Sequence, residues 1–156
     1  MTRSTVENLA ILRIAFAVHR RVIDRRRVRL PLFSLQALHP IHRRAARAKA
    51  ARRIRTCAAF RRELLGHGLI TAEFLARCLP SRTPVTIVVL GIRQPFVLDG
   101  NGRLHALRSV FTPQDGMSIE VNAWTVHQPA KVAALFDRYR DRWYPHERGG
   151  LDDRPR

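Results

Sequence analysis

No apolar segment in the 156-residue sequence is long enough to cross a membrane. The longest apolar stretch, residues 9–18, includes Arg13 and is far shorter than the about 20 residues of a membrane-spanning helix. This stretch also lacks the small-residue cleavage site of a secretory signal peptide. We therefore expect a cytoplasmic protein that has no membrane partner.

Cysteine is scarce as well. Cys57 and Cys78 are the only two cysteines, they lie 21 positions apart, and they form no Cys-x-x-Cys pair. This spacing predicts neither a disulfide framework nor a structural zinc site. Both residues have apolar neighbours in helical patterns, which is typical of small buried side chains.

Acidic residues and lysines are the other shortages. Only 2 of the 29 basic residues are lysines, and the 12 acidic residues leave a net charge of +17. The excess is uneven: residues 1–82 have 19 basic and 4 acidic residues, whereas residues 83–156 have 10 and 8. This imbalance predicts a polyanionic partner, either nucleic acid or a phosphate-rich ligand. An anionic membrane is less favoured because Trp124 and Trp143 lie outside the basic half.

Apolar periodicity predicts a mixture of helices and strands. The predicted helices cover residues 4–24, 41–65, 72–79, 104–111 and 129–143, and the predicted strands cover residues 28–33, 85–90, 95–98 and 118–126. In the first helix, Leu9, Leu12 and Phe16 share one side. Pro31 restricts the first strand to a sheet edge or a strand end. The pattern indicates an α+β fold with a small mixed β-sheet and packed helices.

The segment Asp99-Gly100-Asn101-Gly102-Arg103 connects a predicted strand to a predicted helix. The glycines permit close approach of a ligand, the helix start offers N–H groups to an anion, and Arg103 can bind phosphate oxygens in pairs. Asn101 could donate to a phosphate or a sugar, and Asp99 could hold a hydroxyl or a metal. The alternative is an ordinary strand-to-helix turn in which Asp99 caps the helix.

Residues 96–107 resemble the signature of the ParB N-terminal domain/sulfiredoxin superfamily, in which a strand enters Asp-Gly-x-x-Arg-(apolar)-x-Ala and then a helix. Residues 28–38 are similar to the opening strand of that family. Residues 39–44 fall where members carry an Asn-Pro-x-Arg-like element. The resemblance implies a nucleotide-phosphate pocket at the Gly-x-x-Arg turn, to which His42 and Arg43 would add contacts. It also implies ATP or CTP as the nucleotide, with Mg²⁺ as its companion ion.

The resemblance divides the chain into an N-terminal helix (1–27), a ParB/sulfiredoxin-like domain (28–143) with a basic helical insertion, and a disordered tail (144–156). Two departures are informative. The turn has no thiol, which excludes sulfiredoxin chemistry, and Gly102 stands where many members have Arg or His. A second resemblance, to AMP-transferring Fic proteins, is disfavoured because the general-base histidine is missing, with Gln94 nearest.

The arginine-rich segment 43–62 is the candidate nucleic-acid surface. The residues expected to contact nucleic acid are Arg44, Arg47, Arg52, Arg53 and Arg55. The alternative is a solvated helix face with no partner. A nucleotide-dependent phosphotransferase or a nuclease is the competing function, but the first 82 residues offer only four carboxylates, which favours binding over catalysis.

Two further points stay open. His39 and His42 have a spacing that would suit a metal on a helix, but Pro40 between them disfavours helical geometry, so no metal site is expected. The sequence is compatible with a homodimer without requiring one.

Overall fold

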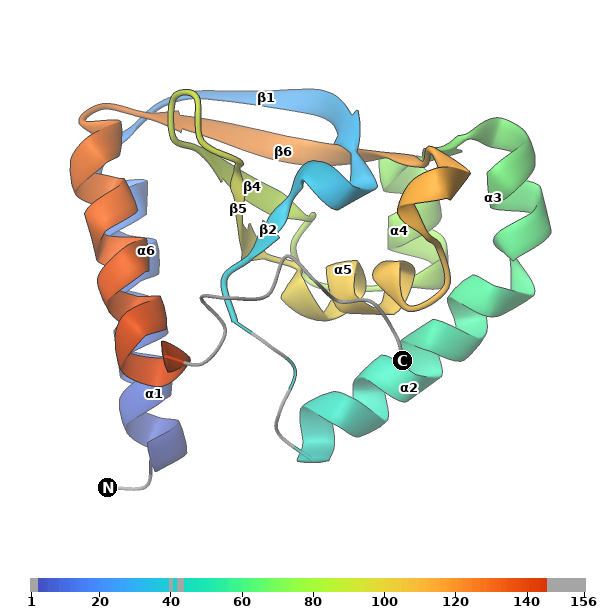
Figure 1. Ribbon diagram of the computed structural model, residues 1–156, viewed down its shortest axis with the longest axis horizontal. Coiled ribbons are helices and arrows are strands. Elements are labelled where there is room, and N and C mark those ends of the chain that lie inside the picture. The colour runs from blue at the N-terminus through green and yellow to red at the C-terminus, as the bar shows by residue number, and fades with distance from the viewer. Residues whose placement is uncertain (1–2, 40, 42–43, 146–156) are drawn as a thin grey trace.

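The computed structural model of the chain describes residues 3–39, 41 and 44–145. In this part of the chain, a mixed six-stranded sheet has helices packed around it (Figure 1). The strands are β1 (Val22–Pro31), β2 (Gln36–Ala37), β3 (Leu69–Ile70), β4 (Thr86–Val89), β5 (Phe96–Asp99) and β6 (Ser118–Val126). The expected α+β class with a small mixed sheet is therefore confirmed.

The sheet has the order β1-β6-β4-β5-β2, and β3 also pairs with β6. Along its whole length β6 is antiparallel to β1, which forms one edge of the sheet and ends at Pro31 as expected. On its other side, β6 pairs with two strands that run parallel to it. The first, β3, pairs with Ser118 and Ile119, and the second, β4, pairs with the residues from Asn122 onward. The sheet is therefore split beside Glu120 and Val121.

Two hydrophobic cores lie on the two faces of the sheet. Side chains of consecutive strand residues point to opposite faces, so Ile87 enters one core and Val88 the other. Helices α1 (Arg3–His19) and α6 (Pro129–Trp143) lie side by side over the second core. The first core is covered by α2 (Arg44–Ala59), α3 (Arg61–His67), α4 (Ala72–Cys78) and α5 (Asn101–Arg108). The 3₁₀ turns η1 (Leu32–Ser34) and η2 (Pro113–Asp115) complete the elements.

Helix α1 differs from its prediction in both length and orientation. It ends at His19, and residues 22–27 are the first part of β1, where pairing with β6 satisfies the backbone. The side with Leu12 and Phe16 faces solvent, each side chain being 63% exposed, while Ile14 and Val18 are buried. The buried side of the helix also contains Glu7, so the hydrophobic pattern of the sequence does not identify this side as buried.

Glu7 is tolerated in the second core because it is hydrogen-bonded there. Its side chain is 3% exposed, and its carboxylate accepts hydrogen bonds from the hydroxyl groups of Tyr139 and Tyr144. A buried carboxylate needs such donors, since an unsatisfied buried charge is strongly unfavourable. Tyr144 therefore packs against the domain, and the predicted tail from residue 146 onward lies outside the described residues.

The predicted helix over residues 41–65 is interrupted. Phe60 separates α2 from α3 and stacks edge-on against Phe74 of α4, with ring centroids 5.6 Å apart. Gly68 ends α3 in a left-handed conformation, and Thr71 caps α4 by accepting a hydrogen bond from the N–H of Phe74; both caps are as expected. Among the described residues, no helix is long and apolar enough to span a membrane.

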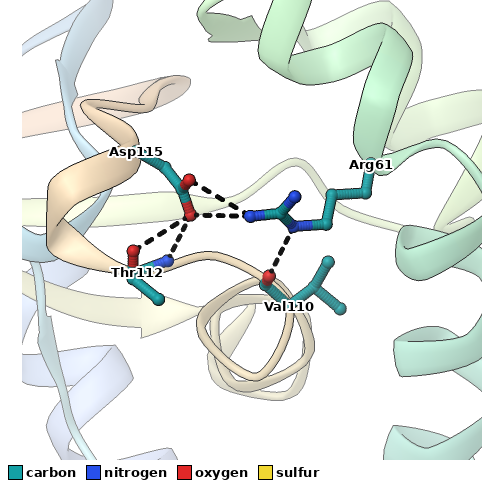
Figure 2. Close-up of polar contacts among 4 residues, drawn as sticks. All are labelled: Arg61, Val110, Thr112 and Asp115. Carbon is teal, nitrogen blue, oxygen red and sulfur yellow. Dashed lines mark hydrogen bonds and ion pairs between the residues drawn. The ribbon is translucent and has the colours of Figure 1, made fainter.

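An arginine clamp holds α3 against the connection from α5 to β6 (Figure 2). Arg61 donates from Nε to the carbonyl oxygen of Val110 at 3.2 Å and from Nη2 to both carboxylate oxygens of Asp115 at 3.1 and 3.3 Å. Asp115 also accepts from the N–H and hydroxyl of Thr112. The N–H of Thr112, together with its hydroxyl and Arg61, lowers the pKa of Asp115.

We expect Arg61→Met to lower the free energy of unfolding by about 1 kcal/mol at neutral pH, because it removes hydrogen bonds that link α3 to two other segments. The neighbouring Arg62 is exposed, so Arg62→Met should change the free energy of unfolding by less than about 0.5 kcal/mol. Urea denaturation measures both values.

The clamp also predicts a pH dependence. Because the pKa of Asp115 is lowered by folding, its ionised form stabilises the fold above the unfolded pKa, and this contribution is lost as the pH falls through the folded pKa. Arg61→Met raises the folded pKa, so the variant should lose less stability than the parent between about pH 5 and about pH 2. Equal acid-dependent losses would contradict this interpretation.

Candidate anion-binding site

A cavity of about 370 Å³ lies at the split in the sheet. Glu120, Val121 and Asn122 of β6 form its floor, and its walls come from α4, from residues 81–85 before β4, and from Arg27 of β1. Arg103, in the first turn of α5, also lines it. Five segments of the chain therefore meet at this cavity.

Arg103 has the most unusual environment of the lining residues. It is 3% exposed, and its Nη2 nitrogen has no hydrogen-bond partner among the described residues. Burial lowers the pKa of Arg103, Asp99 opposes that change, and Arg53 adds to it. Arginine nevertheless remains charged at neutral pH. A buried cationic nitrogen in this situation is suited to bind an anion, which would supply the acceptor.

Gly100 shapes the turn that places Arg103. It has a φ of 104°, in the left-handed region, and it is the N-cap of α5. A Cβ atom at this position would lie 3.0 Å from a methyl carbon of Val85 and 3.2 Å from Nη2 of Arg103. Gly100 is therefore required by its left-handed backbone and by its close neighbours in the protein, whereas the expected close approach of a ligand stays a prediction.

Gly102 lies close to a different side chain, that of Arg53. A Cβ atom there would lie 2.8 Å from Nη1 of Arg53, which reaches across from α2. Arg53 is half-buried, and burial lowers its pKa while Asp99 opposes the change. Arg53, predicted as a nucleic-acid contact, thus lies at the same turn as Arg103, and the two guanidinium groups flank the start of α5.

Asn101 and Asp99 are engaged within the protein. Asn101 is buried, its Oδ1 accepts from the N–H of Leu38 at 2.8 Å, and its Nδ2 donates to the carbonyl of Val97 at 3.0 Å. Its side chain holds the chain after β2 against β5 and does not line the cavity, as a direct ligand contact would require. Asp99 accepts a hydrogen bond from the hydroxyl of Thr83, which does line the cavity.

The remaining predicted site residues are distributed as follows. Arg47, Arg52 and Arg55 are exposed on α2. His42 and Arg43 lie outside the described residues, and so does the side chain of Arg44.

Sequence reasoning missed Arg27, Ser81, Arg82 and Thr83, all of which line the cavity. Arg27 falls at the end of the predicted N-terminal helix (1–27), but it belongs to β1. Ser81, Arg82 and Thr83 precede β4 directly, so a polar stretch entering a buried strand was the available signal.

Two carboxylates partly offset the cationic lining. Glu120 accepts from the N–H of Ala72 at 3.0 Å and from Nε of Arg29 at 3.2 Å, and the Ala72 amide and then Arg29 lower the pKa of Glu120. Glu73 lies 3.5 Å from Arg27, in a pair whose side chains are both more than half exposed. The described residues contain no group of three or more His, Cys, Asp or Glu side chains that could hold a metal.

A larger hollow, of about 710 Å³, lies at the junction of α2 and α3 and is lined by residues such as Ala58, Arg61 and Arg62. Arg61 is already bonded to Asp115 and Val110 there. Because Arg103 has no such partners in the described part of the chain, the cavity at the sheet split is the better candidate.

The same substitution at the two glycines of the turn should change the stability of the fold by different amounts. Gly100→Ala should lower the free energy of unfolding by about 1–3 kcal/mol, because it forces a left-handed residue against Val85. Gly102→Ala displaces only the mobile end of Arg53, so we expect a change below about 1 kcal/mol. Urea denaturation distinguishes them, and equal losses would refute this description of the turn.

Comparison of the chain with protein-family models, with curated proteins and with solved structures returned no match. The function is therefore inferred from the geometry of the cavity and its arginines.

Proposed function

We propose that the chain is a ParB-like domain that binds the phosphate groups of a nucleotide in the cavity at the sheet split and binds nucleic acid through α2. The nucleotide site is supported by Arg103, because its buried Nη2 has no hydrogen-bond acceptor in residues 3–39, 41 and 44–145. The strand–turn–helix pattern of residues 96–107 in a mixed sheet supports the ParB-like assignment.

The chemistry of the cavity suits a phosphate. Arg27, Arg82 and Arg103 contribute guanidinium groups, which match the planar oxygen pairs of phosphate, and Ser81 contributes a hydroxyl donor. A phosphate bonded to Nη2 of Arg103 would relieve the cost of a buried unsatisfied donor, about 1–3 kcal/mol.

Binding is favoured over catalysis because the carboxylates near the cavity already have partners. Glu120 is bonded to Ala72 and Arg29, Glu73 pairs with Arg27, and Asp99 accepts from Thr83. Phosphoryl transfer requires a carboxylate that holds a metal and a group that orients the nucleophile. Asp99 remains the candidate ligand for a nucleotide-bound Mg²⁺.

The nucleic-acid part rests on α2. Arg47, Lys49, Arg52 and Arg55 are exposed along this helix, and the helix itself contains no acidic residue. Such a face binds phosphates by releasing counterions, without reading base sequence. Four such contacts should lower the affinity by about 10²-fold between about 50 and about 200 mM salt.

The cavity is tested by a thermal-shift panel of ATP, CTP, GTP and inorganic phosphate. A ligand at about 100 times its Kd stabilises the fold by about 2.7 kcal/mol, which for a domain of this size raises Tm by roughly 5–10 °C. Arg103→Met should abolish this shift without lowering the Tm of the ligand-free protein, because it removes a buried charge lacking an acceptor in the described chain.

The control for this panel is Arg138→Met, which removes an exposed arginine from α6 and should retain the full shift. A shift that survives in Arg103→Met, or the absence of any shift in the parent protein, would refute the cavity as the phosphate site.

The α2 surface is tested by fluorescence anisotropy with duplex DNA. The double variant Arg52→Ala/Arg55→Ala should bind more weakly and reduce the slope of log K against log salt by about 2, one per lost phosphate contact. The charge-matched variant Arg138→Ala/Arg142→Ala removes two exposed arginines from α6 and should leave the slope unchanged. Equal effects of the two variants would show that net charge, and not α2, governs binding.

A further inference from the structure

A path of arginines leads from α2 through the cavity to the edge strand β1. Arg53 on α2 lies over Gly102, close enough to affect the ionisation of Arg103. Arg103 lines the same cavity as Arg27, which belongs to β1. The exposed basic face of α2 and the basic edge of the sheet are therefore connected through the cavity.

The series of arginines on β1 continues beyond the cavity. Arg25, Arg27 and Arg29 alternate along the strand and pair with Trp124, Asn122 and Glu120 of β6, so they share one face. Arg25 is held over the ring of Trp124, 4.7 Å from its centroid, and is hydrogen-bonded to His19. The edge thus presents cations at intervals of about 6.6–6.8 Å, two residues of an extended strand.

We infer that the phosphate site in the cavity also takes a backbone phosphate of a polynucleotide strand that runs from α2 to β1. The inference rests on the proposed function, since it requires an anion at Arg103 and nucleic acid at α2. A free nucleotide and the strand then compete for one site, with a backbone phosphate at Arg103 and neighbouring phosphates on the flanking arginines.

The lining of the cavity supports a backbone phosphate. A volume of about 370 Å³ is near the lower end of small-molecule pockets, about 300–1,000 Å³. In the described part of the chain, no aromatic ring lines the cavity, so a base would have no stacking surface there. A site with guanidinium and hydroxyl donors but no base platform recognises phosphate and leaves the base outside.

The acidic neighbours of this path are compatible with a polyanion. Glu120 is held by Ala72 and Arg29. Arg27 and Glu73 form an exposed pair at 3.5 Å, which contributes little to stability, so a phosphate can replace Glu73 as the partner of Arg27. Asp99 lies near both Arg53 and Arg103 and accepts a hydrogen bond from the exposed hydroxyl of Thr83.

The test is competition on the intact chain. A fluorescent single-stranded DNA of mixed sequence, about 20 nucleotides long, is titrated with the protein in the presence of ATP, CTP or inorganic phosphate at constant ionic strength. One shared site predicts that nucleotide raises the apparent Kd for the DNA and that the effect saturates near the loss of about tenfold expected for Arg103→Met. Simultaneous binding, with an unchanged Kd for the DNA, would overturn the inference while leaving the proposed function intact.

Two matched pairs of variants locate the strand. Arg103→Met should weaken DNA binding about tenfold, the loss of one charge-assisted contact, whereas Arg138→Met should have little effect. Arg27→Gln should weaken binding several-fold, whereas Arg26→Gln, at the next residue and on the opposite face of β1, should not. Equal effects within either pair would also overturn the inference, and absence of both DNA and nucleotide binding would refute the proposed function itself.

Discussion

A guanidinium group buried beside a turn, with one nitrogen that has no acceptor in the described chain, is the constraint on which this account depends. Such a group is costly in a folded protein unless another molecule completes its hydrogen bonds. Arg103 is kept in place because α5 begins at a left-handed glycine and its first residue, Asn101, is bonded to two backbone groups. The turn is therefore rigid before any anion arrives, and little ordering remains to oppose binding.

The rest of the fold holds this turn in position. The split between β3 and β4 opens the sheet where Arg27, Arg82 and Arg103 converge. Arg61 fixes α3 to the segment that follows α5, and Glu7 fixes α1 to α6 through two tyrosines. In each case a charged side chain joins distant segments through several hydrogen bonds. Arg103 differs from them because one of its buried donors has no acceptor in the described residues.

Local patterns were sufficient for the elements with strong periodicity or clear end signals. The strand 118–126, the helix 129–143, the Thr71 cap and the Gly68 terminus were all predicted correctly. The errors involve long-range pairing: β1 includes four arginines because β6 supplies its partners, and α1 buries Glu7 because tyrosines from the far end of the chain satisfy it. For the site, the Gly100 conformation and Arg103 followed from the motif. The cavity residues Arg27 and Ser81 to Thr83 did not, since only the sheet split brings them to Arg103.

The most direct measurement is anomalous diffraction from crystals soaked in tungstate, a heavy tetrahedral analogue of phosphate. The account predicts an anomalous peak in the cavity at the sheet split, with its oxygens within hydrogen-bonding distance of Nη2 of Arg103. Crystals in which Nη2 is bonded to a carboxylate of the protein itself, with no anion beside it, would contradict the account.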